Sequence, residues 1–267
     1  MSQAEHAKRI VVKVGTSTLT YESGKPNIRR MESLARVLAD LHHSGKEIVL
    51  VSSGALGVGL GKLGISERPT DVPKRQALAA VGQCELMFLY DKLFSEYTST
   101  VAQVLLTPDV IDEDLRKNNV INTLNTLIEM GIIPVVNEND TVSTAEIAGA
   151  NFGDNDRLSA IVARLIDADM LVLLTDIDGL HDRDPRNDPE AVRIPVVLNI
   201  DKNVMALAGG TGSLRGTGGM ITKLHAAEYA CSAGIDTYIL NGESPSILYD
   251  LLDGKTVGTH FVAHHAK

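Results

Sequence analysis

The stretch Ile10-Val11-Val12-Lys13-Val14-Gly15-Thr16-Ser17 decides the fold. Its near-continuous β-branched residues are typical of a strand buried on both faces of a parallel sheet. The sequence therefore predicts a sheet of mostly parallel strands, the first of which carries Lys13 to a turn of small residues. Comparable apolar runs predict strands at residues 9–14, 47–51, 132–136, 169–174 and 235–240.

Helical periodicity separates these predicted strands. Apolar residues between Ile28 and Leu41 recur at three- and four-residue steps and are followed by Gly45. This pattern is typical of an amphipathic helix with a glycine near its end. Residues 76–94 show a similar pattern. Strands that alternate with helices predict an α/β fold, in which helices cover both faces of a mostly parallel sheet.

The length, charge and cysteine content narrow the class of protein. The 267 residues contain no linker, so we expect a single domain over residues 1–267. A formal net charge of −9 disfavours nucleic acid as a partner, because binding to its phosphate backbone requires a positive surface. Cys84 and Cys231 belong to no metal-binding motif, so a disulfide framework or structural zinc is not expected. The absence of an apolar signal core or membrane-length apolar run favours a cytoplasmic protein.

A glycine-rich stretch, Gly216-Thr217-Gly218-Gly219-Met220-Ile221-Thr222-Lys223, precedes a helical run near the end of the chain. Glycines let backbone amides approach an anion, a helix start presents unpaired N–H groups, and Lys223 adds a positive charge. The spacing differs from that of a Walker A loop. We expect this stretch to bind phosphate groups together with Lys13. The alternative is that both lysines extend their ammonium groups into water.

Ser53 and Gly54 follow the second predicted strand. In open parallel sheets, ligands bind beyond the carboxyl ends of the strands. We therefore expect Ser53 and the backbone amides after it to hold a substrate carboxylate. The alternative is that Ser53 is a helix N-cap, a position that serine favours. No G-x-S-x-G motif or histidine partner indicates a nucleophilic serine.

Two polar clusters, Asn137-Glu138-Asn139-Asp140 and Gly153-Asp154-Asn155-Asp156, are less than about twenty residues apart. We expect Asp140 to accept a substrate ammonium group, Asn155 to bind a polar head group, and Asp156 to orient the lysines or a metal. One buried charge-assisted hydrogen bond contributes on the order of 1.5–3 kcal/mol, enough to distinguish amino from acylamino substrates. Each cluster taken alone is equally consistent with ordinary turn sequence.

A nucleotide contact is expected after the strand at residues 169–174, where Thr175 and Asp176 begin the segment Thr175-Asp176-Ile177-Asp178-Gly179. The alternative is a glycine-containing turn that only changes the chain direction. The following residues 182–189 are rich in Asp and Pro and indicate an exposed excursion.

The sequence resembles the amino-acid kinase family along its whole length. The combination of NENDTV, GDND and GTGGM-x-TK resembles the branch of that family that phosphorylates free L-glutamate. The motifs that carry the resemblance are VVKVGTSTLT, VSSGA, LAAVGQ, QVLLT, NENDTV, FGDNDRLSA, LLTDIDGL with the DPR that follows, GTGGMITKLHAA and AGIDT.

The resemblance implies a three-layer αβα sandwich around a mostly parallel sheet. The implied reaction converts ATP and L-glutamate to γ-glutamyl phosphate and ADP with Mg²⁺, the first step of proline biosynthesis. It also implies a homo-oligomer, a dimer or tetramer, and leaves feedback by proline possible. No protein residue is assigned as a metal ligand. The implied roles are catalytic for Lys13, Lys223 and Asp156; substrate binding for Ser53, Gly54, Asp140 and Asn155; and ATP binding for Lys13, Thr175, Asp176, Thr217, Gly218, Gly219, Met220 and Lys223.

The sequence departs from the family pattern at three places. His181 stands where the family usually has tyrosine, and Ser52 where threonine is frequent. Many relatives also carry a C-terminal PUA domain of RNA-binding type. This chain ends at Lys267, so we expect a form without that domain.

The same residues are consistent with other functions. The nearest are other kinases of the same family, of the N-acetylglutamate kinase, aspartokinase or uridylate kinase type. The carboxylate of Asp140 favours a free amine over an acylated one, because an acylated amine carries no positive charge. A non-catalytic sensor of amino acid or nucleotide is a further alternative, although such a protein could dispense with both lysines.

Overall fold

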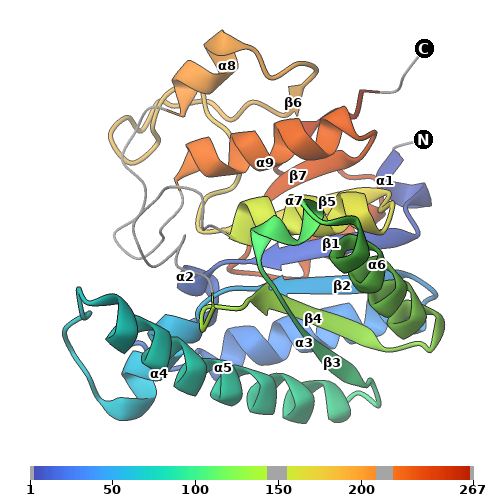
Figure 1. Cartoon of the computed structure of the whole chain (residues 1–267). Coiled ribbons are helices and arrows are strands. Elements are labelled where there is room, and N and C mark those ends of the chain that lie inside the picture. Colours follow the sequence, from blue (N-terminus) through green and yellow to red (C-terminus); the bar gives the residue numbers. More distant parts are fainter. Residues whose placement is uncertain (1–2, 143–154, 209–218, 265–267) are drawn as a thin grey trace.

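The computed structural model describes residues 3–142, 155–208 and 219–264. Within these residues an eight-stranded sheet has the order β3-β4-β2-β1-β5-β7-β8-β6 (Figure 1). Every strand pairing in the described sheet is parallel except β7–β8. The strands are β1 Arg9–Val14, β2 Glu47–Ser52, β3 Val101–Leu106, β4 Ile133–Glu138, β5 Met170–Thr175, β6 Val196–Val197, β7 Asp236–Asn241 and β8 Thr259–Phe261.

Helices cover both faces of this sheet, which confirms the predicted αβα sandwich with a mostly parallel centre (Figure 1). One core lies between the sheet and α3, α5 and α10, and the other lies between the sheet and α6, α7 and α9. The helices are α1 Gln3–His6, α2 Thr16–Leu19, α3 Ile28–His43, α4 Ala55–Leu63, α5 Val72–Ser95, α6 Asp114–Glu129, α7 Asn155–Leu165, α8 Lys202–Leu207, α9 Met220–Ser232 and α10 Ile247–Leu252, with a 3-10 helix η1 at Pro108–Ile111.

Strand β1 shows how the sequence divides between the two cores. Val12 and Val14 pack in the core under α3 and α5, whereas Val11 packs in the core under α7 and α9. Because side chains of a strand alternate between the faces of a sheet, Lys13 shares the face of Val11. The ammonium group of Lys13 is thereby directed to the side of the sheet where α7 and α9 begin.

The five predicted strands are all present, and their ends differ from the predicted ones by at most two residues. Helix α5 begins earlier than predicted, at Val72, because the side chain of Asp71 caps it by accepting from the backbone N–H of Lys74. Strands β3, β6 and β8 were not predicted from the sequence. Strand β3 lies at the edge of the sheet and is only partly buried, and β6 and β8 are too short to produce a periodic pattern.

Glycines let α4 and α5 pack with their backbones in contact. A Cβ atom at Gly82 of α5 would overlap the carbonyl oxygen of Ala55, and one at Gly59 of α4 would overlap that of Leu78. Helix α4 begins directly after β2, so this packing fixes the start of α4 at the carboxyl edge of the sheet. No helix in the described ranges has both the length and the hydropathy that a membrane span requires.

Candidate active site

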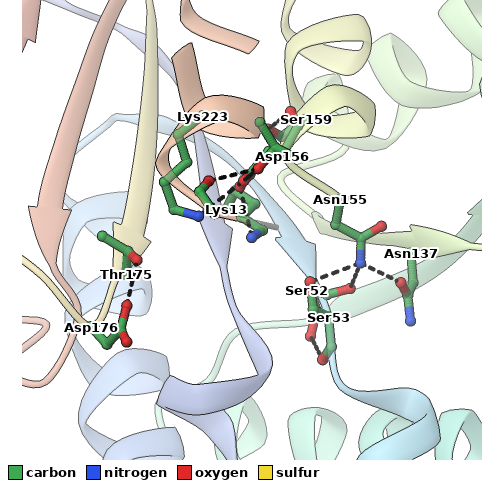
Figure 2. Close-up of polar contacts among 12 residues, drawn as sticks. Lys13, Ser52, Ser53, Asn137, Asn155, Asp156, Ser159, Thr175, Asp176 and Lys223 are labelled. Carbon is green, nitrogen blue, oxygen red and sulfur yellow. Dashed lines mark hydrogen bonds and ion pairs between the residues drawn. The ribbon is translucent and has the colours of Figure 1, made fainter. Parts of the chain in front are cut away.

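Two lysines and one carboxylate form a buried ionic cluster at the carboxyl end of β1 (Figure 2). The Nζ of Lys13 lies 2.7 Å from Oδ1 of Asp156, and the Nζ of Lys223 lies 3.1 Å from Oδ2 of the same carboxylate. Asp156 is 0% exposed, Lys13 4% and Lys223 6%. The reading of both lysines as solvated side chains is therefore wrong. These three groups together carry one net positive charge, which favours an anion beside them.

Three separate elements build this cluster. Lys13 comes from β1, Asp156 from the first turn of α7, and Lys223 from the first turns of α9. An acidic residue in the first turn of a helix interacts favourably with the helix dipole, so α7 stabilises the charged form of Asp156. A lysine near a helix start is opposed by the same dipole, and the carboxylate of Asp156 compensates for that cost at Lys223.

Thr222 is a further member of the cluster that the sequence analysis did not identify. Its Oγ1 lies 2.9 Å from Oδ2 of Asp156 and 2.9 Å from the carbonyl oxygen of Gly219. Gly219 is the N-cap of α9 and Met220 is its first residue. Thr217 and Gly218, also predicted to bind ATP, lie outside the described residues.

A second polar cluster centres on the amide of Asn155, the residue before Asp156. Its Nδ2 lies 3.0 Å from the carbonyl oxygen of Ser52, 2.9 Å from Oγ of Ser53 and 2.9 Å from Oδ1 of Asn137. The reading of Ser53 as a helix N-cap is wrong, because the N-cap of α4 is Gly54 and no side chain caps that helix. Ser53 instead contacts an amide that lies across the carboxyl edge of the sheet.

A cavity of about 650 Å³ adjoins this polar cluster. Three of the predicted substrate residues, Gly54, Asp140 and Asn155, line it, whereas Ser53 does not. Asn155 is 3% exposed, and its Oδ1 atom has no hydrogen-bond partner among the described residues. A buried amide oxygen without a partner is costly, so a ligand that donates a hydrogen bond there would be stabilised.

The cavity and the ionic cluster meet at the turn after β1. A Cβ atom at Gly15 would lie 3.7 Å from Nζ of Lys13, so the ammonium group lies close to this turn. The next residue, Thr16, lines the cavity and lies against Gly54. The consecutive residues Asn155 and Asp156 make the same connection from the other side, since one lines the cavity and the other holds the lysines.

The outer wall of the cavity consists of residues that the sequence analysis did not assign. The turn at residues 21–25 contributes to this wall. Arg68, which precedes α5, and Arg75, in the first turn of α5, also contribute. Gly24 lies in the left-handed region with φ +76, and a Cβ atom there would be 2.8 Å from the carbonyl oxygen of Gly57 in α4. This turn contains a serine and a glycine, residue types that favour turns, and they could have indicated the turn from the sequence.

The predicted nucleotide residues Thr175 and Asp176 lie at the end of β5, on the other side of β1 (Figure 2). Oγ1 of Thr175 donates to Oδ1 of Asp176 at 3.0 Å, and Nη2 of Arg186 lies 3.3 Å from Oδ2 of Asp176. Arg186 belongs to the segment predicted as an exposed excursion. That segment is therefore tied to the end of β5 by an ion pair.

The order of the strands determines where these polar groups lie along the carboxyl edge of the sheet. Asn137 ends β4, Ser53 follows β2, Lys13 lies near the end of β1 and Thr175 ends β5, and these four strands are neighbours in the sheet. The ionic cluster thus lies between the cavity on the β4–β2 side and the Thr175–Asp176 pair on the β5 side. Among the described residues, no group of three or more His, Cys, Asp or Glu side chains is arranged to hold a metal ion.

A profile described as "Amino acid kinase family" matches residues 8–241. The chain belongs to the amino acid kinase family. Relatives named glutamate 5-kinase include a protein of Clostridium perfringens, 57% identical over 96% of both chains, and one of Enterococcus faecalis, 50% identical over 98% of this chain and 97% of the relative. A protein of the same name from Listeria innocua is 52% identical over 97% of this chain and 94% of the relative.

Solved structures support the fold of this amino acid kinase. Isopentenyl phosphate kinase of T. acidophilum superposes with a TM-score of 0.64 at 16% identity, covering 95% of this chain and 99% of that chain. UMP kinase of Bacillus anthracis superposes with a TM-score of 0.64 at 16% identity, covering 97% of each. At such identity the similarity establishes the fold and not the substrate.

Proposed function

We propose that this amino acid kinase is a glutamate 5-kinase, which transfers the γ-phosphoryl group of ATP to the γ-carboxylate of L-glutamate in the first step of proline biosynthesis. Relatives of that name at 50–57% identity support the substrate. The structural observation that carries the proposal is the pair of consecutive residues Asn155 and Asp156. The first lines a cavity that contains polar groups for an amino acid, and the second holds two ammonium groups beside that cavity.

The reaction requires placement and charge compensation more than proton transfer. A carboxylate with a pKa of about 4.3 is already ionised at neutral pH, so the nucleophile needs no general base. Negative charge spreads over the transferred phosphoryl group in the transition state. Lys13 and Lys223 are held where they can neutralise that charge, and their fixed positions avoid a reorganisation cost during reaction.

Residues in the cavity wall and beside it account for recognition of the amino acid in this proposal. We assign Asp140 to the substrate ammonium group, and Ser53, Asn155 and the backbone at Gly54 to the remaining polar contacts. The buried Oδ1 of Asn155 accepts hydrogen bonds, which suits a donor such as an ammonium group. An acylated amine carries no positive charge, so it would form no ion pair with the carboxylate of Asp140 and would bind less tightly for that reason alone. Selectivity against N-acetylglutamate therefore tests this assignment.

The nucleotide side is assigned to the residues around β5 and the start of α9. Thr175 and Asp176 are proposed to contact ATP, together with Thr217, Gly218, Gly219 and Met220 before and at the start of α9. Lys13 and Lys223 are proposed to contact the γ-phosphoryl group. A helix start that lacks a side-chain cap, as at Gly219, leaves backbone N–H groups for phosphate oxygens.

We propose that Mg²⁺ enters the site as its complex with ATP. Mg²⁺ keeps several waters and is commonly held by substrate phosphates with only one or two protein carboxylates. The donor set here fits that mode, since the buried Asp156 carboxylate is engaged by both lysines. When bound, the metal supplies additional charge neutralisation at the phosphate oxygens. The lysines would hold the same phosphate groups from the protein side.

A hydroxylamine assay tests the proposed function, because acyl phosphates convert to hydroxamates. The purified chain with MgATP is expected to form hydroxamate with L-glutamate, and far less with N-acetylglutamate, L-aspartate or uridylate. Preference for one of the other acceptors would assign the chain to another branch of the family. ATP binding without turnover of any acceptor would support a sensor. The same assay with added proline measures feedback.

The remaining assignments concern assembly and location. We propose a cytoplasmic homo-oligomer in which residues 1–267 form a single kinase domain. Light scattering during size-exclusion chromatography measures the mass of the assembly. A monomer at the concentration of the assay would contradict the proposed assembly.

A further inference from the structure

The LAAVGQ motif at residues 78–83 has no role in the proposed reaction, yet its last residue reaches the polar cluster beside the cavity. Oε1 of Gln83, on α5, accepts a hydrogen bond of 2.7 Å from Nδ2 of Asn137. Oδ1 of Asn137 in turn accepts from Nδ2 of Asn155 at 2.9 Å. Gln83 does not line the cavity, whereas Asn137 and Asn155 both do. A chain of amides therefore runs from the middle of α5 to the cavity wall.

Backbone groups fix the direction of each amide in this chain. The carbonyl oxygen of Ser52 can only accept, so it requires Nδ2 of Asn155 on its side, at 3.0 Å. The backbone N–H of Glu138 can only donate, so it requires Oδ1 of Asn137 on its side, at 2.8 Å. These constraints leave Nδ2 of Asn137 facing α5, where it needs an acceptor. Gln83 provides that acceptor, and Oδ1 of Asn155 is left on the side away from Ser52, Ser53 and Asn137 (Figure 2).

Burial makes the acceptor on Gln83 important. Asn137 and Asn155 are each 3% exposed, so an amide hydrogen left without a partner cannot simply turn to water. Leaving a buried donor unsatisfied costs on the order of 1–3 kcal/mol. Rotating the amide of Asn137 would not relieve the cost. Its Nδ2 would then face two donors, the N–H of Glu138 and Nδ2 of Asn155.

We propose that Gln83 is a positioning residue for the amino-acid substrate: its Oε1 holds Asn137, and through it the Oδ1 of Asn155, in the orientation that accepts a hydrogen bond from the substrate. The inference rests on the proposed function, because it assumes that the cavity takes the amino acid. Gln83 contacts neither the ionic cluster nor the end of β5. Its loss should weaken binding of the acceptor and spare the phosphoryl-transfer step.

The packing of α5 is consistent with this role. Gly82, the neighbour of Gln83, permits contact between the backbones of α4 and α5. Seven residues after Gln83, about two helical turns further along α5, the hydroxyl group of Tyr90 lies 2.8 Å from Oγ of Ser52, and burial raises the pKa of Tyr90 well above its ordinary value of 10. Tyr90 thus remains a neutral partner of Ser52. Helix α5 therefore supports the substrate side of the site at both Gln83 and Tyr90.

Two substitutions of Gln83 separate the effect of its hydrogen-bond acceptor from the effect of its side-chain size. Gln83→Met removes the amide acceptor and keeps a similar length, whereas Gln83→Glu keeps an oxygen that can accept from Asn137. The matched control is Glu85→Met, which removes the ion pair between Glu85 of α5 and Lys62 of α4 and does not touch Asn137. KM for glutamate, KM for ATP and kcat are measured in the hydroxamate assay, and thermal unfolding checks the fold.

For Gln83→Met we expect KM for glutamate to rise about 10- to 100-fold, with kcat and KM for ATP within a few-fold of the unsubstituted chain. Gln83→Glu should recover most of the loss, and Glu85→Met should change none of these constants. Equal KM values for Gln83→Met and the unsubstituted chain would overturn the inference and leave the proposed function intact. An equal loss in Gln83→Glu would also overturn it, because the acceptor would then be irrelevant.

If the methionine variant does not fold, Gln83→Ala replaces it and is held to the same expectation. If the unsubstituted chain forms no hydroxamate from glutamate, the proposed function and this inference both fail. The two failures are therefore distinguished by the activity of the unsubstituted chain.

Discussion

Lys13 and Lys223 contact the two different oxygens of one carboxylate, that of Asp156, although they come from the first strand and a late helix. The shared counter-ion holds two like charges close together in a buried region, where they would otherwise repel strongly. It also fixes their positions before any substrate binds. Such an arrangement would supply the fixed positive charge that the proposed phosphoryl transfer requires.

Removal of either ammonium group should reduce turnover more than binding. We expect Lys13→Ala and Lys223→Ala to lower kcat by about 100- to 1000-fold, because each removes a fixed positive charge that matters most in the transition state. KM for glutamate should change by about threefold or less. Steady-state kinetics measure both constants, with Lys92→Ala, at an exposed position of α5, as the control. Near-normal turnover in either variant would contradict the assigned role.

Neutralising Asp156 should destabilise the fold as well as abolish activity. Asp156→Asn leaves two buried ammonium groups without their shared carboxylate. Breaking a buried ion pair on one side typically costs about 3–5 kcal/mol. Urea unfolding should show a loss of that order, whereas Asp91→Asn, at an exposed position of α5, should be neutral. An Asp156→Asn protein as stable as the parent would mean that the lysines do not depend on this carboxylate.

Because α4 and α5 cross with their backbones in contact, we expect one methyl group added at Gly82 to destabilise the fold strongly. Gly82→Ala places a Cβ atom against the carbonyl oxygen of Ala55, and the backbone there has no room to yield without separating the helices. We expect destabilisation of about 3 kcal/mol or more by chemical denaturation. Gly45→Ala is the matched control, since a Cβ atom there meets nothing within 4 Å and only the positive φ of 95° opposes it. Equal losses in the two variants would show that helix contact is not the cause.

We expect Glu47 to make a pH-dependent contribution to the free energy of unfolding. Its carboxylate pairs with Lys8 at 2.8 Å and Arg9 at 2.7 Å, and the hydrogen bond from Lys8 is the main cause that lowers the pKa of Glu47 below its ordinary 4.5. The stabilisation is therefore present above pH 4.5 and is lost as the pH falls through the lowered pKa of the folded state. Glu47→Gln should lower Tm at pH 7, and the difference should shrink on acidification. The exposed Glu129→Gln should show no such convergence.

The two cysteines should differ sharply in reactivity. Burial raises the pKa of Cys231 to about 11, while Cys84 is exposed on α5. Because the thiolate is the reactive form, only about one in a thousand Cys231 side chains is reactive at pH 8, before burial limits access. Mass spectrometry after iodoacetamide treatment should find one adduct in the native chain and two after denaturation. A native Cys84→Ser protein that is readily alkylated would contradict the burial of Cys231.

Many of the proposed site residues were predictable because the buried strands of a parallel sheet have a recognisable apolar pattern, and ligands bind beyond their carboxyl ends. The apolar run around Lys13 predicted a buried strand, and polar residues directly after the strands predicted which edge of the sheet would bind ligands. Asp140 and Asn155, which line the cavity, and Ser53, which contacts Asn155, were proposed as substrate residues in this way. The role of Thr222 and the chain from Gln83 to Asn155 were not predicted, since a threonine or glutamine within a helical pattern carries no local signal of what it contacts.

By itself, the sequence determined the αβα class and the set of polar residues at the carboxyl edge, because alternation of apolar runs and helical periodicity depends on local spacing. Only the tertiary structure decided which of those residues meet. The alternation of side chains along β1 directs Lys13 to the face of α7 and α9, and the packing of those helices brings Asp156 and Lys223 to it. Such contacts depend on helix positions across the sheet, which no spacing along the chain specifies.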